Sequence, residues 1–188
     1  KKLLYSGKNF NCCVCGSDIR RFIPLNAQFM ICLEICGKNF TSYDFETLNV
    51  KNYSCPFCGA SDRERLYALY FKKIFGDAGK ETKIIHFAPE ISLEKFIRRY
   101  NFKNYRTADF KMKNVDDTID IMNMNIYNDS QFDFFICSHI LEHICDDQKA
   151  VKELLPILSD YHTELAQNEK IYSALKAIEA TEKGTLTK

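Results

Sequence analysis

The segment Gln131–Ile144 (QFDFFICSHILEHI) constrains the fold of this chain more than any other. Its apolar run Phe132–Cys137 is typical of a strand that is buried in a parallel sheet. The run ends in the polar pair Ser138 and His139, and the letters LEHI then indicate the start of a helix. Open α/β sheets bind ligands beyond the carboxyl ends of their strands, so these polar residues are candidates for chemistry.

A strand–helix–strand pattern lies upstream of this segment. Lys83–Phe87 (KIIHF) and Tyr105–Phe110 (YRTADF) are predicted strands, and Ser92 is expected to cap the helix between them. That helix is expected to bury one apolar side, made of Leu93, Phe96, Ile97 and Tyr100. The order predicts two parallel strands that are joined by a right-handed crossover.

A further helix is predicted before the first of these strands. Ser61 and Glu64 have the spacing of a capping box, and Gly76 is expected to end the helix. Its predicted apolar face consists of Leu66, Leu69, Tyr70 and Ile74.

Two C-x-x-C-G knuckles precede that helix, Cys12–Gly16 (CCVCG) and Cys55–Gly59 (CPFCG). Each knuckle can point two thiolates at one ion, and four thiolates around tetrahedral zinc form a closed structural site. The predicted ligands are Cys12, Cys15, Cys55 and Cys58.

The remaining cysteines leave alternatives open. Cys13 competes with Cys12, although only Cys12 has the C-x-x-C spacing to Cys15, and Cys32 or Cys36 could replace one ligand. The chain has 9 cysteines, an odd number that argues against a disulfide framework. The insert between the knuckles contains two strand-like pieces, Phe22–Leu25 and Phe29–Cys36, which are expected to form a small hairpin.

An acidic residue stands where a nucleoside site would need one. Asp109 lies 23 positions after His86, close to the spacing of roughly 20 residues at which a carboxylate meets ribose hydroxyls. The same residue type also serves as a cap or a turn former, so the spacing alone leaves both roles open.

The combination of motifs resembles class I S-adenosylmethionine-dependent methyltransferases of the type 11-like group. IIHFAPE, ADF, DxTIDI and FDFFICSHILEHICDD occur in that order, after a C-x-x-C pair and the CGxxxRxRL segment at Cys58–Leu66. The match covers roughly Cys12 to Leu158. The resemblance implies a Rossmann-like α/β sheet, S-adenosylmethionine as cofactor and a methyl acceptor that the sequence does not identify.

The resemblance also implies site residues. The loop His86, Phe87, Ala88, Pro89 and Glu90 would lie along the methionine part of the cofactor, in place of the common D-x-G-x-G loop. Asp109 would bind the ribose, Asp120 and Ile121 would flank the adenine, and Ser138 and His139 would border the place of methyl transfer. His139 is the candidate proton acceptor, with a hydrogen-bonding or packing role as the alternative.

The carboxyl end departs from the family pattern. After the predicted helix that Asp146 and Asp147 begin, the family would add further strands, but no strand signal follows Leu158. We therefore expect a partial sheet of about four parallel strands and a helical tail. The predicted domains are a zinc module at 1–60, a Rossmann-like domain at 61–158 and the tail at 159–188.

Charge and hydropathy limit the partners. The net charge of +1 gives no global signal for binding to nucleic acid. The sequence allows nucleic acid as a partner but does not favour it. A basic stretch with interleaved Tyr100, Phe102 and Tyr105 could support RNA binding; its cations are Lys95, Arg98, Arg99, Lys103, Arg106, Lys111 and Lys113. No apolar run reaches bilayer length, so we expect a cytoplasmic protein without a membrane partner. A non-catalytic zinc-bearing module that binds protein or RNA is the alternative function.

Overall fold

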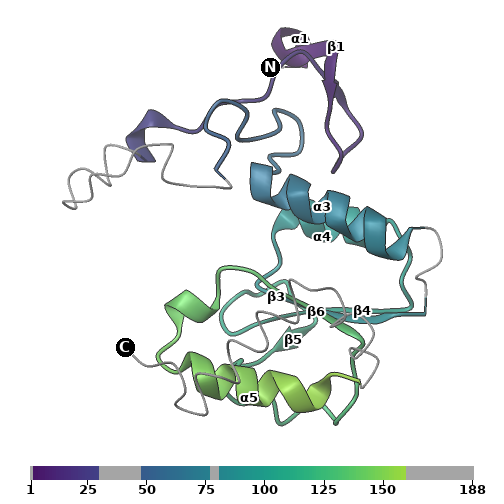
Figure 1. Cartoon of the computed structure of the whole chain (residues 1–188), viewed down its shortest axis with the longest axis vertical. Helices are drawn as coiled ribbons and strands as arrows, with labels where there is room; N and C mark the ends of the chain where they lie inside the picture. The colour runs from purple at the N-terminus through teal and green to yellow at the C-terminus, as the bar shows by residue number, and fades with distance from the viewer. Residues whose placement is uncertain (1, 30–47, 77–80, 160–188) are drawn as a thin grey trace, which may run out of the picture. The chain divides into compact units, whose positions relative to one another are not determined.

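The computed structural model describes residues 2–29, 48–76 and 81–159 (Figure 1). Contacts divide the chain into two compact units, Lys1–Lys80 with Pro89–Phe102 and Glu81–Ala88 with Lys103–Lys188. The domain boundaries expected after residues 60 and 158 stay predictions. Cys32, Cys36 and nearly all of the predicted strand Phe29–Cys36 lie outside the described residues.

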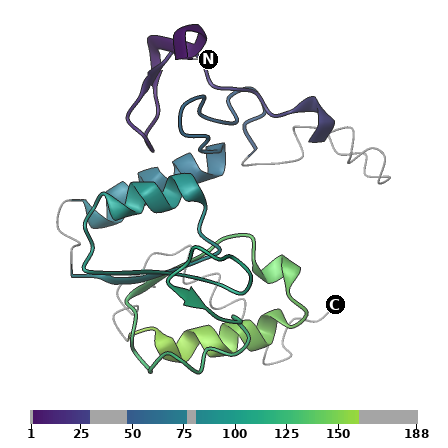
Figure 2. The ribbon, with the colours of Figure 1, turned by 180° about the vertical axis from the view of Figure 1, so that it is seen from behind.

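The first unit combines a small hairpin with one short and two longer helices. Its described elements are α1 (Lys2–Tyr5), β1 (Ser6–Asn11), β2 (Asp18–Ile19), α3 (Asp62–Phe75) and α4 (Ile91–Arg98). The strands β1 and β2 pair antiparallel, and the first knuckle forms the turn between them. The helices α3 and α4 run side by side in both views (Figure 1 and Figure 2).

The capping box that begins α3 is confirmed. The Glu64 amide donates to the Ser61 hydroxyl, and the Ser61 amide donates to the Glu64 carboxylate. Gly76 ends the helix as predicted. The predicted apolar face, however, is wrong: the residues that are buried are Glu64, Ala68, Phe71 and Phe75. The rings of Phe71 and Phe75 occupy the core, which leaves Leu66, Leu69 and Tyr70 exposed on the other side.

The helix α4 buries Leu93, Phe96 and Ile97 as predicted, but the fourth predicted residue, Tyr100, lies beyond its end and is only partly buried. The prediction that Ser92 caps this helix is wrong. Glu90 is the N-cap residue, and Ser92 lies inside the first turn, where its hydroxyl donates to the Cys58 carbonyl.

The second unit is built on a parallel sheet of four strands, which confirms the expected strand number. Its elements are β3 (Lys83–Phe87), β4 (Asn104–Asp109), β5 (Asp117–Thr118), β6 (Phe134–Cys137), η1 (Leu141–His143) and α5 (Asp147–Ile157). The spatial order is β5-β4-β3-β6, and every neighbouring pair is parallel. The carboxyl ends of all four strands therefore lie at one edge.

The core of the second unit lies between the sheet and α5. Ile85, Phe87 and Ala108 from the sheet pack with Ala150 and Leu154 from the helix. The helix lies along one side of the sheet in Figure 1 and Figure 2. Alternation along β3 places Ile84 and His86 on the opposite face, where both are also buried.

The sheet pairing continues at the end of the described chain. Leu158 forms a parallel bridge to Phe132, and the Ser159 amide donates to the Phe132 carbonyl. The residues directly after α5 therefore pair with the chain just before β6. The predicted helical tail beyond residue 159 lies outside the described residues.

Candidate functional sites

The four predicted metal ligands come together. The Sγ atoms of Cys12, Cys15, Cys55 and Cys58 all lie within 4.8 Å of one another. The Cys12–Cys58 and Cys15–Cys55 pairs are each separated by 3.8 Å. A tetrahedron with Zn–S bonds of about 2.3 Å has S–S edges of about 3.8 Å. The four cysteines can therefore hold a zinc ion.

Both knuckles have the same backbone pattern. The Gly16 amide donates to the Cys12 carbonyl at 2.7 Å, and the Gly59 amide donates to the Cys55 carbonyl at 2.9 Å. The two glycines have φ of 74° and 81°, a left-handed conformation that costs glycine little and other residues more. This turn is what brings each pair of thiols onto one side of the backbone.

The geometry separates Cys13 from the cluster. Its Sγ contacts the Arg65 carbonyl oxygen at 3.3 Å. Among the alternatives left open by the sequence, the described residues thus favour Cys12 over Cys13 as the partner of Cys15.

The thiols of the cluster share their protons unequally. The hydrogen bond from Cys58 lowers the pKa of Cys12 to about 4, and the same contact together with burial raises the pKa of Cys58. Burial also raises the pKa of Cys55. A metal ligand must be a thiolate, so metal binding would release the protons that Cys55 and Cys58 hold.

Side chains from α3 and α4 support the backbone of both knuckles. The Lys72 Nζ donates to the Cys13 carbonyl at 3.0 Å, and the Ser92 hydroxyl donates to the Cys58 carbonyl at 2.6 Å. Arg99 donates to the Val14 carbonyl. Sequence reasoning missed these supports because no local motif marks a side chain that binds a distant carbonyl.

The guanidinium of Arg65 donates hydrogen bonds to the chain on both sides of the second knuckle. It donates to the carbonyls of Tyr53 at 2.8 Å and Ala60 at 3.2 Å, and its Cζ lies 4.1 Å from the centroid of the Phe22 ring. This arginine is one of the two in the CGASDRERL segment, which was the available sequence signal for its role.

The second candidate site is the edge where the parallel strands end. Ala88 directly follows β3, Asp109 is the last residue of β4, and Ser138 directly follows β6. Register pairs Phe87 with both Ala108 and Cys137, so the three strands end level with one another. Three of the residues predicted to meet a cofactor, Ala88, Asp109 and Ser138, thus lie at one edge of the sheet.

The predicted loop from His86 to Glu90 is divided by the fold. His86 and Phe87 belong to β3 and are buried, and His86 Nδ1 lies 2.8 Å from the Tyr105 hydroxyl. Ala88 turns the chain with φ of 45°. Pro89 and Glu90 belong to the first unit, where Glu90 begins α4 and its carboxylate lies 3.7 Å from Arg63.

Of the four other predicted cofactor residues, Asp109 and Asp120 are partly exposed and Ile121 is buried. Asp109 Oδ1 accepts from the amides of Lys111 at 2.6 Å and Met112 at 2.7 Å, which fixes the turn after β4. Asp120 caps a turn in the same way, because its Oδ1 accepts from the Met122 amide. The Ile121 side chain is buried in the core that packs against α5.

The turn after β6 presents His139 to solvent. Its φ is 54°, a strained value for a residue other than glycine. His139 Nδ1 lies 2.6 Å from Glu142 Oε1, and both side chains are about half exposed. The pKa of Glu142 is lowered by a hydrogen bond from its own amide and by the neighbouring His139 and His143.

The aromatic residues of the predicted basic stretch are engaged elsewhere. Tyr100 and Phe102 pack edge-on against the Phe71 ring, with centroids at 5.5 and 5.4 Å. Tyr105 contacts His86. These rings take part in the packing of their own units, and RNA binding by this stretch stays a prediction.

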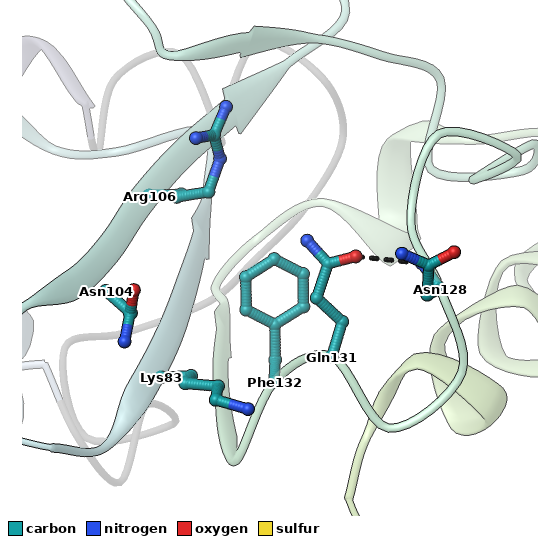
Figure 3. A pocket seen from close by; sticks show the side chains of 6 residues that line it. All are labelled: Lys83, Asn104, Arg106, Asn128, Gln131 and Phe132. Carbon is teal, nitrogen blue, oxygen red and sulfur yellow. Dashed lines mark hydrogen bonds between the residues drawn. The ribbon is translucent and has the colours of Figure 1, made fainter.

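A cavity of about 300 Å³ lies at the other edge of the sheet. It is lined by residues from the beginnings of strands and from the loop before β6, namely Lys83, Asn104, Arg106, Asn128, Gln131 and Phe132 (Figure 3). Arg106 is held there by two hydrogen bonds to the Asp117 carboxylate. Sequence reasoning missed this cavity because it looked for chemistry only where strands end.

Among the described residues, no helix combines the length and the apolar character needed to cross a bilayer. Comparisons with models of protein families, with curated proteins and with solved structures find no match to this chain. What the protein does must therefore be inferred from its own geometry.

Proposed function

We propose that this protein is an S-adenosylmethionine-dependent methyltransferase with a structural zinc centre. The observation that carries the proposal is the order of the strands. Numbered along the chain, the four parallel strands lie in the spatial order 3-2-1-4. This is the beginning of the Rossmann-like order, in which ligands bind at the carboxyl edge where the order reverses.

The reversal lies between β3 and β6, next to the residues that the sequence resemblance selects. Ala88 follows β3, and Ser138 and His139 follow β6. The bridge between Phe132 and Leu158 supports the same topology, because it places the chain after α5 where a fifth strand beside β6 would begin. The helix α5 would then be the crossover that leads to this position.

The residues at this edge offer groups that a nucleoside cofactor would use. The turn after β3 lacks the usual glycines, but Ala88 adopts the left-handed conformation that glycine would supply. Asp109 uses Oδ1 to hold its own turn. Its Oδ2, which has no hydrogen-bond partner in the described part of the chain, would accept from ribose hydroxyls.

The remaining roles follow from position and chemistry. The cofactor, when bound, supplies the methyl group that is transferred to the acceptor. Asp120 would meet the adenine through its side chain, whereas the buried Ile121 would contribute through its backbone. The Glu142 carboxylate accepts from Nδ1 of His139, which leaves Nε2 to take a proton from the acceptor.

Calorimetric titration with S-adenosylhomocysteine tests this proposal. We expect saturable binding that Asp109→Asn weakens about tenfold, because the variant keeps the turn but loses the charge that favours ribose hydroxyls. Asp129→Asn, an exposed matched change, should bind like the natural sequence. No heat of binding at millimolar ligand would favour the alternative, a non-catalytic zinc-bearing binding module.

A further inference from the structure

The two compact units carry opposite charge, although the whole chain is nearly neutral. The first unit holds 15 of the 26 Lys and Arg residues and 9 of the 25 Asp and Glu residues, a formal charge of +6. The second unit holds the other 11 basic and 16 acidic residues, a formal charge of −5. A tetrathiolate zinc centre would remove about two charges from the first unit and leave it positive.

Three exposed cations of the first unit lie at its hairpin. Lys8 lies on β1, Arg20 and Arg21 directly follow β2, and all three are exposed. The only acidic residue from Lys2 to Arg21 is Asp18, whose Oδ1 accepts from the Asn11 amide group at 2.9 Å. In the described part of the chain, Lys8 and Arg20 have no ion-pair partner.

This hairpin differs from the rest of the first unit. Arg65, Lys72 and Arg99 are also basic, but they donate to backbone carbonyls around the knuckles. Lys51, Lys73 and Lys95 are exposed elsewhere in the first unit. What distinguishes the hairpin is the exposed Phe10 ring on the same strand as Lys8 and the Tyr5 ring beside Arg21.

Two aromatic rings lie among the hairpin cations. Phe10 is 44% exposed, and its ring packs at 5.6 Å on the Phe22 ring, which fixes its position. The Arg21 guanidinium lies 5.5 Å from the centroid of the Tyr5 ring. Proteins bind single-stranded nucleic acids with cations and accessible aromatic rings that lie close together, because phosphates pair with the cations and bases stack on the rings.

We propose that the hairpin surface, made of Tyr5, Lys8, Phe10, Arg20 and Arg21, binds single-stranded nucleic acid. Unpaired bases can reach the Phe10 ring, whereas the bases of a duplex are stacked on each other. The proposal concerns the first unit and does not depend on methyl transfer by the second. The near-zero net charge of the chain concealed this surface at the level of sequence.

Fluorescence anisotropy of labelled oligouridylate and oligothymidylate with the zinc-loaded full chain tests the proposal. The variant Lys8→Gln/Arg20→Gln/Arg21→Gln should bind at least tenfold more weakly. The slope of log affinity against log salt concentration should also become less steep by about two, because each of the three lost phosphate contacts on a single strand contributes roughly 0.7 to that slope. Phe10→Ala should weaken binding about tenfold, through the loss of one stacked base.

A matched variant controls for total charge. Lys113→Gln/Lys149→Gln/Lys152→Gln removes three exposed cations from the second unit and should leave affinity within twofold. Equal losses in the two triple variants, or no saturable binding to either oligonucleotide, would overturn the proposal. Binding to vesicles of anionic lipid in place of oligonucleotides would also overturn it. Zinc content verifies the fold of each variant, and the single change Lys8→Glu repeats the test if the triple variant loses metal.

Discussion

The hydroxyl of Ser92 donates a 2.6 Å hydrogen bond to the carbonyl oxygen of Cys58. Ser92 lies in the first turn of α4, and Cys58 belongs to the four-cysteine cluster that can hold a zinc ion. Lys72 on α3 makes the corresponding bond to Cys13. Hydrogen bonds therefore join the knuckles to α3 and α4, and metal binding by the four-cysteine cluster should affect the stability of both helices.

Removal of zinc should destabilise the helices α3 and α4 as well as the two knuckles. The cluster is too small to hold its shape through apolar burial alone, and structural zinc supplies about 10 kcal/mol or more in small zinc modules. We expect a strong chelator to release about one zinc ion per chain and to reduce the helical circular dichroism signal. Unchanged helical signal and melting temperature after complete metal removal would contradict the coupling.

Substitution of Arg65 should destabilise the first unit strongly. Arg65→Ala would leave the partly buried carbonyls of Tyr53 and Ala60 without their donor and would uncover the Phe22 ring. We expect a loss of about 2–4 kcal/mol in the free energy of unfolding, measured by urea denaturation. Lys73→Ala, on the exposed side of α3, should change it by less than about 0.5 kcal/mol. Equal effects of the two changes would show that Arg65 is not a support.

Cys137 and Cys145 should react with iodoacetamide at very different rates. Burial, with a smaller contribution from Glu142, raises the pKa of Cys137 from 9.0 to about 11. Only about one thiol in a thousand is then ionised at pH 8, and the thiolate is the reactive form. Cys145 is exposed. Mass spectrometry should therefore find Cys145 alkylated first, and equal rates would contradict the buried environment of Cys137.

The same shift predicts a pH effect on stability. The pKa of Cys137 is higher in the folded chain than in the unfolded chain, so the folded state favours the neutral thiol. This contribution is fully present below pH 9 and is lost as the pH rises from about 9 toward 11. Cys137→Ala should flatten the fall in melting temperature over that range, and an unchanged slope would contradict the assignment.

Local signals made much of the fold predictable. The strand KIIHF has the predicted bounds of β3, and β4 is displaced from its predicted range by one residue. The capping box at Ser61 and the repeated C-x-x-C-G spacing each encode their contacts within a few residues. Such features depend on backbone geometry that neighbouring residues fix among themselves.

The errors concern contacts that are not local. The periodicity of α3 allowed two apolar faces, and the aromatic packing of Phe71 with Phe75 decided between them. Ser92 has the residue type of a cap, but its hydroxyl serves a carbonyl 34 positions away. The formal charge of each unit could not be calculated from the sequence either. The sequence does not show that residues 89–102 belong to the same unit as residues 1–80.

The most direct test of the central claim locates the cofactor on one edge of the sheet. In a ¹⁵N-labelled sample titrated with S-adenosylhomocysteine, we expect the largest amide shift changes at Ala88, Asp109 and Ser138, where the strands end. Shift changes confined to Lys83 and Asn104, at the edge that carries the cavity, would contradict the account. A spectrum that does not change at millimolar ligand would contradict it as well.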